Sequence, residues 1–140
     1  TIETLNGPKE VLLKGNADRI DLINNTIRII DYKTGFVEQK DVGTSFEKVL
    51  DHPKANQLLF YAYLYFKNHN KINIQSGIIS LRNLNAGLIN LKLKEDRKEI
   101  ELTAELLEEY EESLIAQIQS IYDTDTTFEH KETAKYCMIC

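Results

Sequence analysis

Long apolar runs, cysteine and excess positive charge are all scarce in this chain of 140 residues. No apolar run approaches the ~20 residues that a helix needs to cross a bilayer, so we expect no membrane segment. The two cysteines, Cys137 and Cys140, are too few and too close together for a disulfide-stapled secreted domain, which favours a reducing cytoplasm. The formal net charge of −5 is unexpected for a protein that grips a phosphate backbone unaided.

Much of the acid lies in one predicted helix. Residues 103–122 contain five glutamates and neither lysine nor arginine, and a solvated helix face explains them. The rest of the chain is nearly neutral, so composition neither supports nor excludes a nucleic-acid ligand. An anionic substrate would need a metal bridge, or basic surfaces from another domain.

The size predicts one domain over residues 1–140 with a core of its own. The chain starts at Thr1, not at Met, and stops at Cys140, and we expect it to be a fragment of a longer protein. Apolar periodicity and turn residues predict strands at 10–23 and 26–35, a loop at 36–44, helices at 45–51 and 54–68, strands at 72–82 and 87–93, and a helix capped by Thr103 that ends at Tyr122. This order predicts an α/β fold with a mixed central β-sheet flanked by helices.

The first two predicted strands meet at Asn24-Asn25. If these two residues form the hairpin loop, residues whose numbers sum to 49 face each other. Asp18 then lies opposite Asp31, and Lys33 projects from the same face. Like charges directly opposite each other destabilise a strand pair, so we expect a cation between the two acids.

A second pair supports this register, because it places Asp21 opposite Arg28 in a favourable cross-strand ion pair. Two carboxylates suit Mg²⁺, which prefers oxygen ligands. The alternative is a salt bridge between Lys33 and either Asp18 or Asp31, which leaves the other acid unexplained.

Three motifs now carry a resemblance: residues 15–21 (GNADRID), residues 30–35 (IDYKTG), and Gln57-Leu58-x-x-Tyr61. In this order they resemble the motifs of the RecB-like and AddB-like nucleases of the PD-(D/E)XK superfamily. The resemblance covers most of the chain and implies a restriction-endonuclease-like core.

The resemblance also implies a role for each matching residue. Asp18 and Asp31 would ligate Mg²⁺ or Mn²⁺, the backbone carbonyl of Tyr32 would complete the shell, and Lys33 would be the catalytic lysine. Family members usually have a further Glu or His ligand on a helix before the first motif. Only fourteen residues precede the motif here, so we expect weak metal binding and a weakly active or inactive fragment.

Two further pairs of residues follow from the same resemblance. Gln57 and Tyr61 would line the cleft, and their i, i+4 spacing puts them on one helix face; the alternative is ordinary packing of that helix on the sheet. Cys137 and Cys140 match the C-terminal cysteine group that holds a 4Fe–4S cluster in AddB-like and CRISPR-associated relatives. Two cysteines cannot hold the cluster alone, so it would form only in the full-length protein. A Zn²⁺ site is the alternative.

The sequence therefore predicts a metal-dependent deoxyribonuclease that hydrolyses DNA phosphodiester bonds. The resemblance implies the exonuclease module of a helicase–nuclease for recombination and repair, with the helicase in the same chain or in a partner subunit. One alternative is a catalytically inactive nuclease-fold module that only binds nucleic acid. Another is an α/β domain whose acids merely hold Lys33 and Arg19.

Overall fold

The computed structural model describes residues 1–125, which fall into two compact units. The larger unit is Leu13–Tyr110, and the smaller combines Thr1–Leu12 with the residues from Glu111 onward. Helix α2 (Ala104–Tyr122) begins in the larger unit and ends in the smaller. Among the described residues, no helix is long and apolar enough to cross a membrane.

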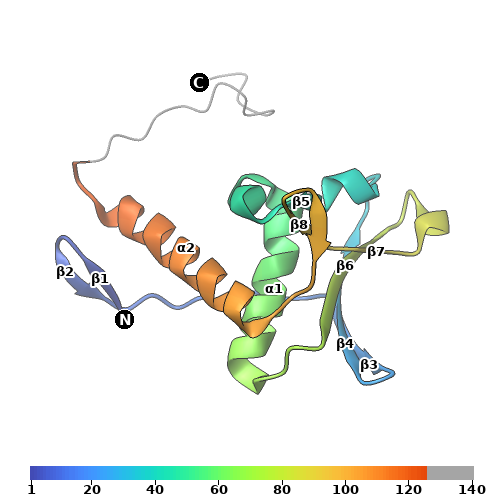
Figure 1. The fold of residues 1–140 in the computed structure, drawn as a ribbon, viewed down its shortest axis with the longest axis horizontal. Helices are drawn as coiled ribbons and strands as arrows, with labels where there is room; N and C mark the ends of the chain where they lie inside the picture. The colour runs from blue at the N-terminus through green and yellow to red at the C-terminus, as the bar shows by residue number, and fades with distance from the viewer. Residues whose placement is uncertain (126–140) are drawn as a thin grey trace. The chain divides into compact units, whose positions relative to one another are not determined.

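The larger unit is built on a four-stranded mixed sheet (Figure 1). Its strands, in spatial order, are β3 (Arg19–Ile23), β4 (Thr26–Lys33), β6 (Ile74–Ser80) and β7 (Leu88–Asn90). β4 and β6 are parallel, and both outer pairs are antiparallel. Parallel neighbours need a crossover, which helix α1 (Pro53–His69) supplies while it packs against both strands. The predicted α/β fold with a mixed central sheet is confirmed.

The hairpin of β3 and β4 has the predicted register. Asn24 and Asn25 have φ values of 49° and 63°, and positive φ at both central residues is typical of the type I′ turn that joins two-residue hairpins. Asp21 pairs with Arg28 across the strands, and the two side chains form a double hydrogen bond at 2.7 and 2.8 Å.

The first hairpin strand begins later than the sequence suggested. Residues 10–18 form no strand, and β3 starts at Arg19. The backbone of Gly15 instead lies against the ring of Tyr61 on α1, and Ala17 packs beside the buried cluster under that helix. The residues just before Arg19 therefore pack on α1 and do not extend the sheet.

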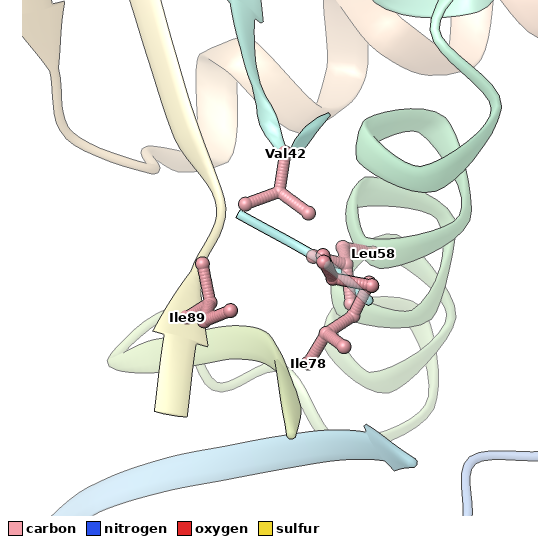
Figure 2. Packing of buried hydrophobic residues seen from close by; sticks show 5 residues of the cluster. Val42, Leu58, Ile78 and Ile89 are labelled. Carbon is pink, nitrogen blue, oxygen red and sulfur yellow. The ribbon is translucent and has the colours of Figure 1, made fainter. Parts of the chain in front are cut away.

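The main core lies between α1 and the sheet. One cluster contains Leu58 from α1, Ile78 from β6 and Ile89 from β7, joined by Val37 and Val42. Figure 2 shows the side chains of Val42, Leu58, Ile78 and Ile89 gathered between the helix and the strands. A second cluster, of Ile27, Ile29, Ala62 and Ile74, lies along the same face. Both clusters help to fix α1 against β4 and β6.

Truncation of Leu58 tests the importance of this core. Its side chain is fully buried, so Leu58→Ala should lower the free energy of unfolding by about 2–5 kcal/mol through lost transfer energy and a cavity. Leu84→Ala is the control, because Leu84 is 63% exposed. Urea titration followed by circular dichroism measures both variants, and equal small losses would contradict the assigned core.

The predicted strand at 87–93 is two strands in different sheets. After β7, the chain enters a three-stranded sheet of β5 (Gly43–Ser45), β8 (Lys92–Glu95) and β9 (Lys98–Ile100), in that order. The Leu91 N–H donates to the Ser76 carbonyl at 2.8 Å, whereas the Lys92 N–H donates to the Val42 carbonyl at 3.1 Å. The chain therefore passes from one sheet to the other between Leu91 and Lys92, which are consecutive residues.

The short elements of the larger unit were predicted only in part. Residues 36–44, predicted as a loop, contain a 3₁₀ helix (Gln39–Asp41) and the start of β5. The short helix predicted at 45–51 is present, as a 3₁₀ helix (Phe46–Asp51). β9 follows a turn at Asp96-Arg97 with positive φ at both residues.

The smaller unit contains one hairpin and most of α2. The hairpin, also unpredicted, pairs β1 (Ile2–Thr4) with β2 (Gly7–Lys9). The Gln119 side chain donates to the Glu3 carbonyl at 2.6 Å, which ties the hairpin to the helix. The start of α2 is as predicted, because the Leu106 N–H donates to the Thr103 hydroxyl at 3.2 Å, as at a helix N-cap.

Candidate active site

Asp31 lies near the end of β4 and is only 5% exposed. Strand alternation places it on the same face as Ile27 and Ile29, which is the face that α1 covers. Its Oδ1 accepts a hydrogen bond from the Gln57 amide at 3.2 Å. Its Oδ2 lies 2.9 Å from Lys33 Nζ, an ionic contact without hydrogen-bond alignment, and makes no hydrogen bond within residues 1–125. The buried carboxylate therefore keeps lone pairs that can bind a cation.

Gln57 joins the remaining groups on this face. Its Oε1 accepts a hydrogen bond from Lys33 Nζ at 3.0 Å, while its Nε2 donates to Asp31 and, at 2.8 Å, to the Tyr61 hydroxyl. The reverse amide orientation would place a donor against the ammonium and an acceptor against the carboxylate. The network therefore fixes the orientation of the amide, and it brings together four of the predicted site residues.

Asp18 lies outside this network but beside it. Its side chain is exposed, and its Oδ2 accepts a hydrogen bond from the Tyr32 N–H at 2.7 Å. Continued by one residue, the β3–β4 register places Asp18 opposite Asp31. The Asp18 carboxylate is therefore held against the β4 backbone at the residue that follows Asp31.

The salt bridge that the sequence offered as an alternative to a metal site is present. It joins Lys33 to Asp31. Among the contacts described above, Asp18 has only the Tyr32 N–H, which is a neutral backbone donor. The two interpretations are compatible, because an ionised carboxylate has about four lone-pair sites and can face an ammonium and a cation together.

The residues present fit a hard divalent cation. A buried carboxylate oxygen without a hydrogen bond and a second carboxylate nearby are oxygen ligands of the kind that Mg²⁺ and Mn²⁺ take. Over residues 1–125, however, no three Asp, Glu, His or Cys side chains come together as a metal-binding group. The rest of the shell would come from backbone carbonyls such as that of Tyr32, from water, or from substrate.

The sequence did not predict the role of three residues that hold the chain after Lys33. Ser80, at the end of β6, is fully buried; its hydroxyl donates to the Gly35 carbonyl at 2.8 Å and accepts from the Val37 N–H at 3.2 Å. The Leu81 N–H donates to the Lys33 carbonyl at 2.9 Å, and the Asn83 amide donates to the Val37 carbonyl at 3.0 Å. A serine that ends an apolar strand is the one signal of this role in the sequence.

The opposite side of the hairpin carries a separate set of charges. The Arg28 guanidinium hydrogen-bonds Asp21 and, with Arg19, keeps the pKa of that carboxyl below its ordinary value of 3.8. A hydrogen bond to Tyr32, with the charge of Asp21, raises the pKa of Arg19. These contacts anchor Tyr32, whose main chain carries the Asp18 contact.

Asp21 should contribute a pH-dependent part of the stability. Because its pKa is lower in the folded protein than its ordinary 3.8, the contribution is complete above that value and is lost as the pH falls through the folded pKa. Asp21→Asn should therefore unfold at lower urea concentration than the parent at pH 7, and the difference should shrink steadily below pH 4. Urea midpoints measured from pH 7 to pH 2 test this, and a constant difference would contradict it.

The terminal cysteines cannot be placed in this arrangement. Cys137 and Cys140 lie outside the described residues, so both the 4Fe–4S cluster and the Zn²⁺ site stay predictions.

Comparison with known proteins identifies the family. The family model of the PD-(D/E)XK nuclease superfamily matches residues 1–140. No curated protein and no solved structure matches the chain. The family match covers the whole chain, including the strand that carries Asp31 and Lys33 and the helix that carries Gln57 and Tyr61. The chain belongs to the PD-(D/E)XK nuclease superfamily.

Proposed function

We propose that this chain is the metal-dependent deoxyribonuclease module of a larger DNA-processing protein. The observation that carries the proposal is the cluster of the buried Asp31 with the partly buried Lys33 and Gln57, where the end of β4 meets α1, with Asp18 beside it. Membership of a nuclease superfamily supports phosphodiester hydrolysis as the reaction and DNA as the substrate.

In this proposal, the two aspartates hold the cation and the lysine acts on the phosphate. Asp31 and Asp18 would bind Mg²⁺ or Mn²⁺, with the Tyr32 carbonyl as a further ligand. When bound, the cation would supply Lewis-acid chemistry, by which a phosphoryl oxygen is polarised and the pKa of an attacking water is lowered. Lys33 lies within reach of the same carboxylate, so its ammonium can stabilise charge that develops on the phosphate or orient the attacking water.

Gln57 and Tyr61 serve this site by position. Gln57 holds the Lys33 ammonium and the Asp31 carboxylate through one amide, which restricts both side chains before substrate arrives. The Tyr61 hydroxyl accepts the second N–H of that amide, and it can also face substrate in the cleft. Such restriction lowers the cost of reaching the reactive geometry.

The finer assignment follows from the motifs. Their similarity to RecB-like and AddB-like nucleases supports an exonuclease within a helicase–nuclease for recombination and repair, with the helicase in the same chain or in a partner subunit. Residues 1–140 would form a single nuclease domain, and Cys137 and Cys140 would contribute to a 4Fe–4S cluster in the full-length protein. An inactive DNA-binding module is the second candidate, but Asp18, Asp31 and Lys33 together favour catalysis.

Digestion of matched DNA substrates tests this function. The full-length protein is incubated with linear and with covalently closed circular DNA, in Mg²⁺, in Mn²⁺ and in EDTA. An exonuclease degrades only the linear DNA, and only with metal. Cleavage of circles would keep the nuclease assignment but exclude a strict exonuclease. DNA binding without cleavage in either metal would favour the inactive module.

A further inference from the structure

We propose that Gly15 is a positioning residue of the candidate active site, because its missing side chain lets Tyr61 hold Gln57 in place. This inference rests on the proposed nuclease function. It goes beyond the motif match, because it gives a physical reason for a glycine at position 15. Gly15 has no side chain that could reach an aspartate, and in this proposal it acts through Tyr61.

The first step is a close approach between Gly15 and α1. A Cβ atom built on Gly15 would lie 3.0 Å from Cε1 and 3.2 Å from Cδ1 of Tyr61, and 3.1 Å from Cδ1 of Leu64. Carbon atoms pack best at about 3.5–4.0 Å, so any side chain at position 15 pushes on the Tyr61 ring. The φ angle of Gly15 lies outside the left-handed region, so space and not backbone freedom is what this position requires.

The Tyr61 ring is linked through Gln57 to Asp31 and Lys33. The Tyr61 hydroxyl accepts a hydrogen bond of 2.8 Å from Gln57 Nε2. The same nitrogen donates to Asp31, and the amide oxygen accepts from Lys33. A ring displaced by a few tenths of an ångström therefore loosens the amide that restrains the acid and the lysine.

The Tyr61 ring also borders open space. Together with Gly15, Leu13 and Tyr65, it lines an open cleft of about 310 Å³. We therefore expect a Gly15→Ala substitution to be accommodated by a small shift of the ring, without unfolding. We expect a protein that folds normally but has a loosened site.

Gly15→Ala should lower kcat for DNA cleavage about five-fold with little change in KM, given that a 1 Å misplacement can cost about a hundred-fold. The link through the hydroxyl predicts a second result. In a Tyr61→Phe background, where the ring remains but the hydroxyl is gone, Gly15→Ala should change kcat by less than about two-fold, since coupled residues give non-additive effects. Asn16→Ala, in the same exposed stretch, is the matched control with unchanged kinetics.

A readout without catalysis separates this proposal from the proposed function. Limited modification of lysines in the full chain, followed by mass spectrometry, should show that Lys33 reacts several-fold faster in Gly15→Ala than in the parent, relative to the exposed Lys94. If the parent never cleaves DNA, the nuclease proposal fails, and the labelling of Lys33 still decides the role of Gly15.

Three outcomes would overturn the proposal: parental kcat with parental Lys33 labelling in Gly15→Ala, an equal loss of kcat in the Tyr61→Phe background, or a loss confined to KM. If Gly15→Ala fails to fold, Tyr61→Phe alone replaces it, because it keeps the ring against Gly15 and cuts only the link. Faster Lys33 labelling in Tyr61→Phe supports the proposal, and parental labelling contradicts it.

Discussion

Asp31→Asn should reduce metal-dependent DNA cleavage about a thousand-fold or more, which corresponds to several kcal/mol of lost transition-state stabilisation. The amide has the size of the carboxylate and can still bond Gln57, but it lacks the charge that holds a divalent cation. Asp31 is buried, and its Oδ2 has no hydrogen bond within residues 1–125. Its negative charge therefore serves the contact with Lys33 and the binding of the cation. The initial rate on end-labelled linear DNA measures the loss.

A second aspartate in the same hairpin provides the control. Asp21 pairs with Arg28 and Arg19, so Asp21→Asn should weaken the fold slightly while the cleavage rate below the unfolding transition stays within about two-fold of the parent. Cleavage by Asp31→Asn at the parental rate, or equal losses in both variants, would remove Asp31 from the site.

Lys33→Met should lower kcat by about a hundred-fold to a thousand-fold, the usual effect of removing a group that stabilises transition-state charge. The same substitution should leave Mn²⁺ affinity unchanged or raise it. The ammonium lies 2.9 Å from Asp31 Oδ2 and so opposes a cation at that oxygen by like-charge repulsion. Opposite effects on turnover and on metal binding are therefore expected from a single residue.

Single-turnover cleavage and calorimetric titration with Mn²⁺ measure these two quantities for Lys33→Met. Lys40→Met is the matched control, because the Lys40 side chain is 79% exposed and pairs only with Glu38 among the ion pairs described; both quantities should match the parent. A Lys33→Met protein that cleaves normally, or that loses Mn²⁺ binding along with activity, would contradict the assigned role.

The parts of the fold that the sequence predicted are those governed by local signals. Two asparagines with positive φ fixed the hairpin turn, and the turn fixed which residues face each other. The i, i+4 spacing of Gln57 and Tyr61 placed both on one face of α1, where a hydrogen bond now joins them. The Thr103 cap was also local, because its hydroxyl bonds an amide three residues away.

The parts that the sequence did not predict depend on distant contacts. β5, β8 and β9 are three or four residues long, too short for apolar alternation to mark them. Gly15 was assigned to a strand because nothing in the sequence shows that it lies against Tyr61. The contact between Lys33 and Gln57 joins residues 24 positions apart, so it became visible only once α1 was placed on the sheet.

A crystal structure of the protein grown or soaked with Mn²⁺, with data collected for anomalous scattering, tests the metal site directly. We predict an anomalous peak from a Mn²⁺ ion that the carboxylates of Asp31 and Asp18 both ligate. The peak should be absent from crystals of Asp31→Asn. A peak that persists in Asp31→Asn, or Mn²⁺ bound only at other carboxylates such as the glutamates of α2, would contradict a metal-dependent active site at the end of β4.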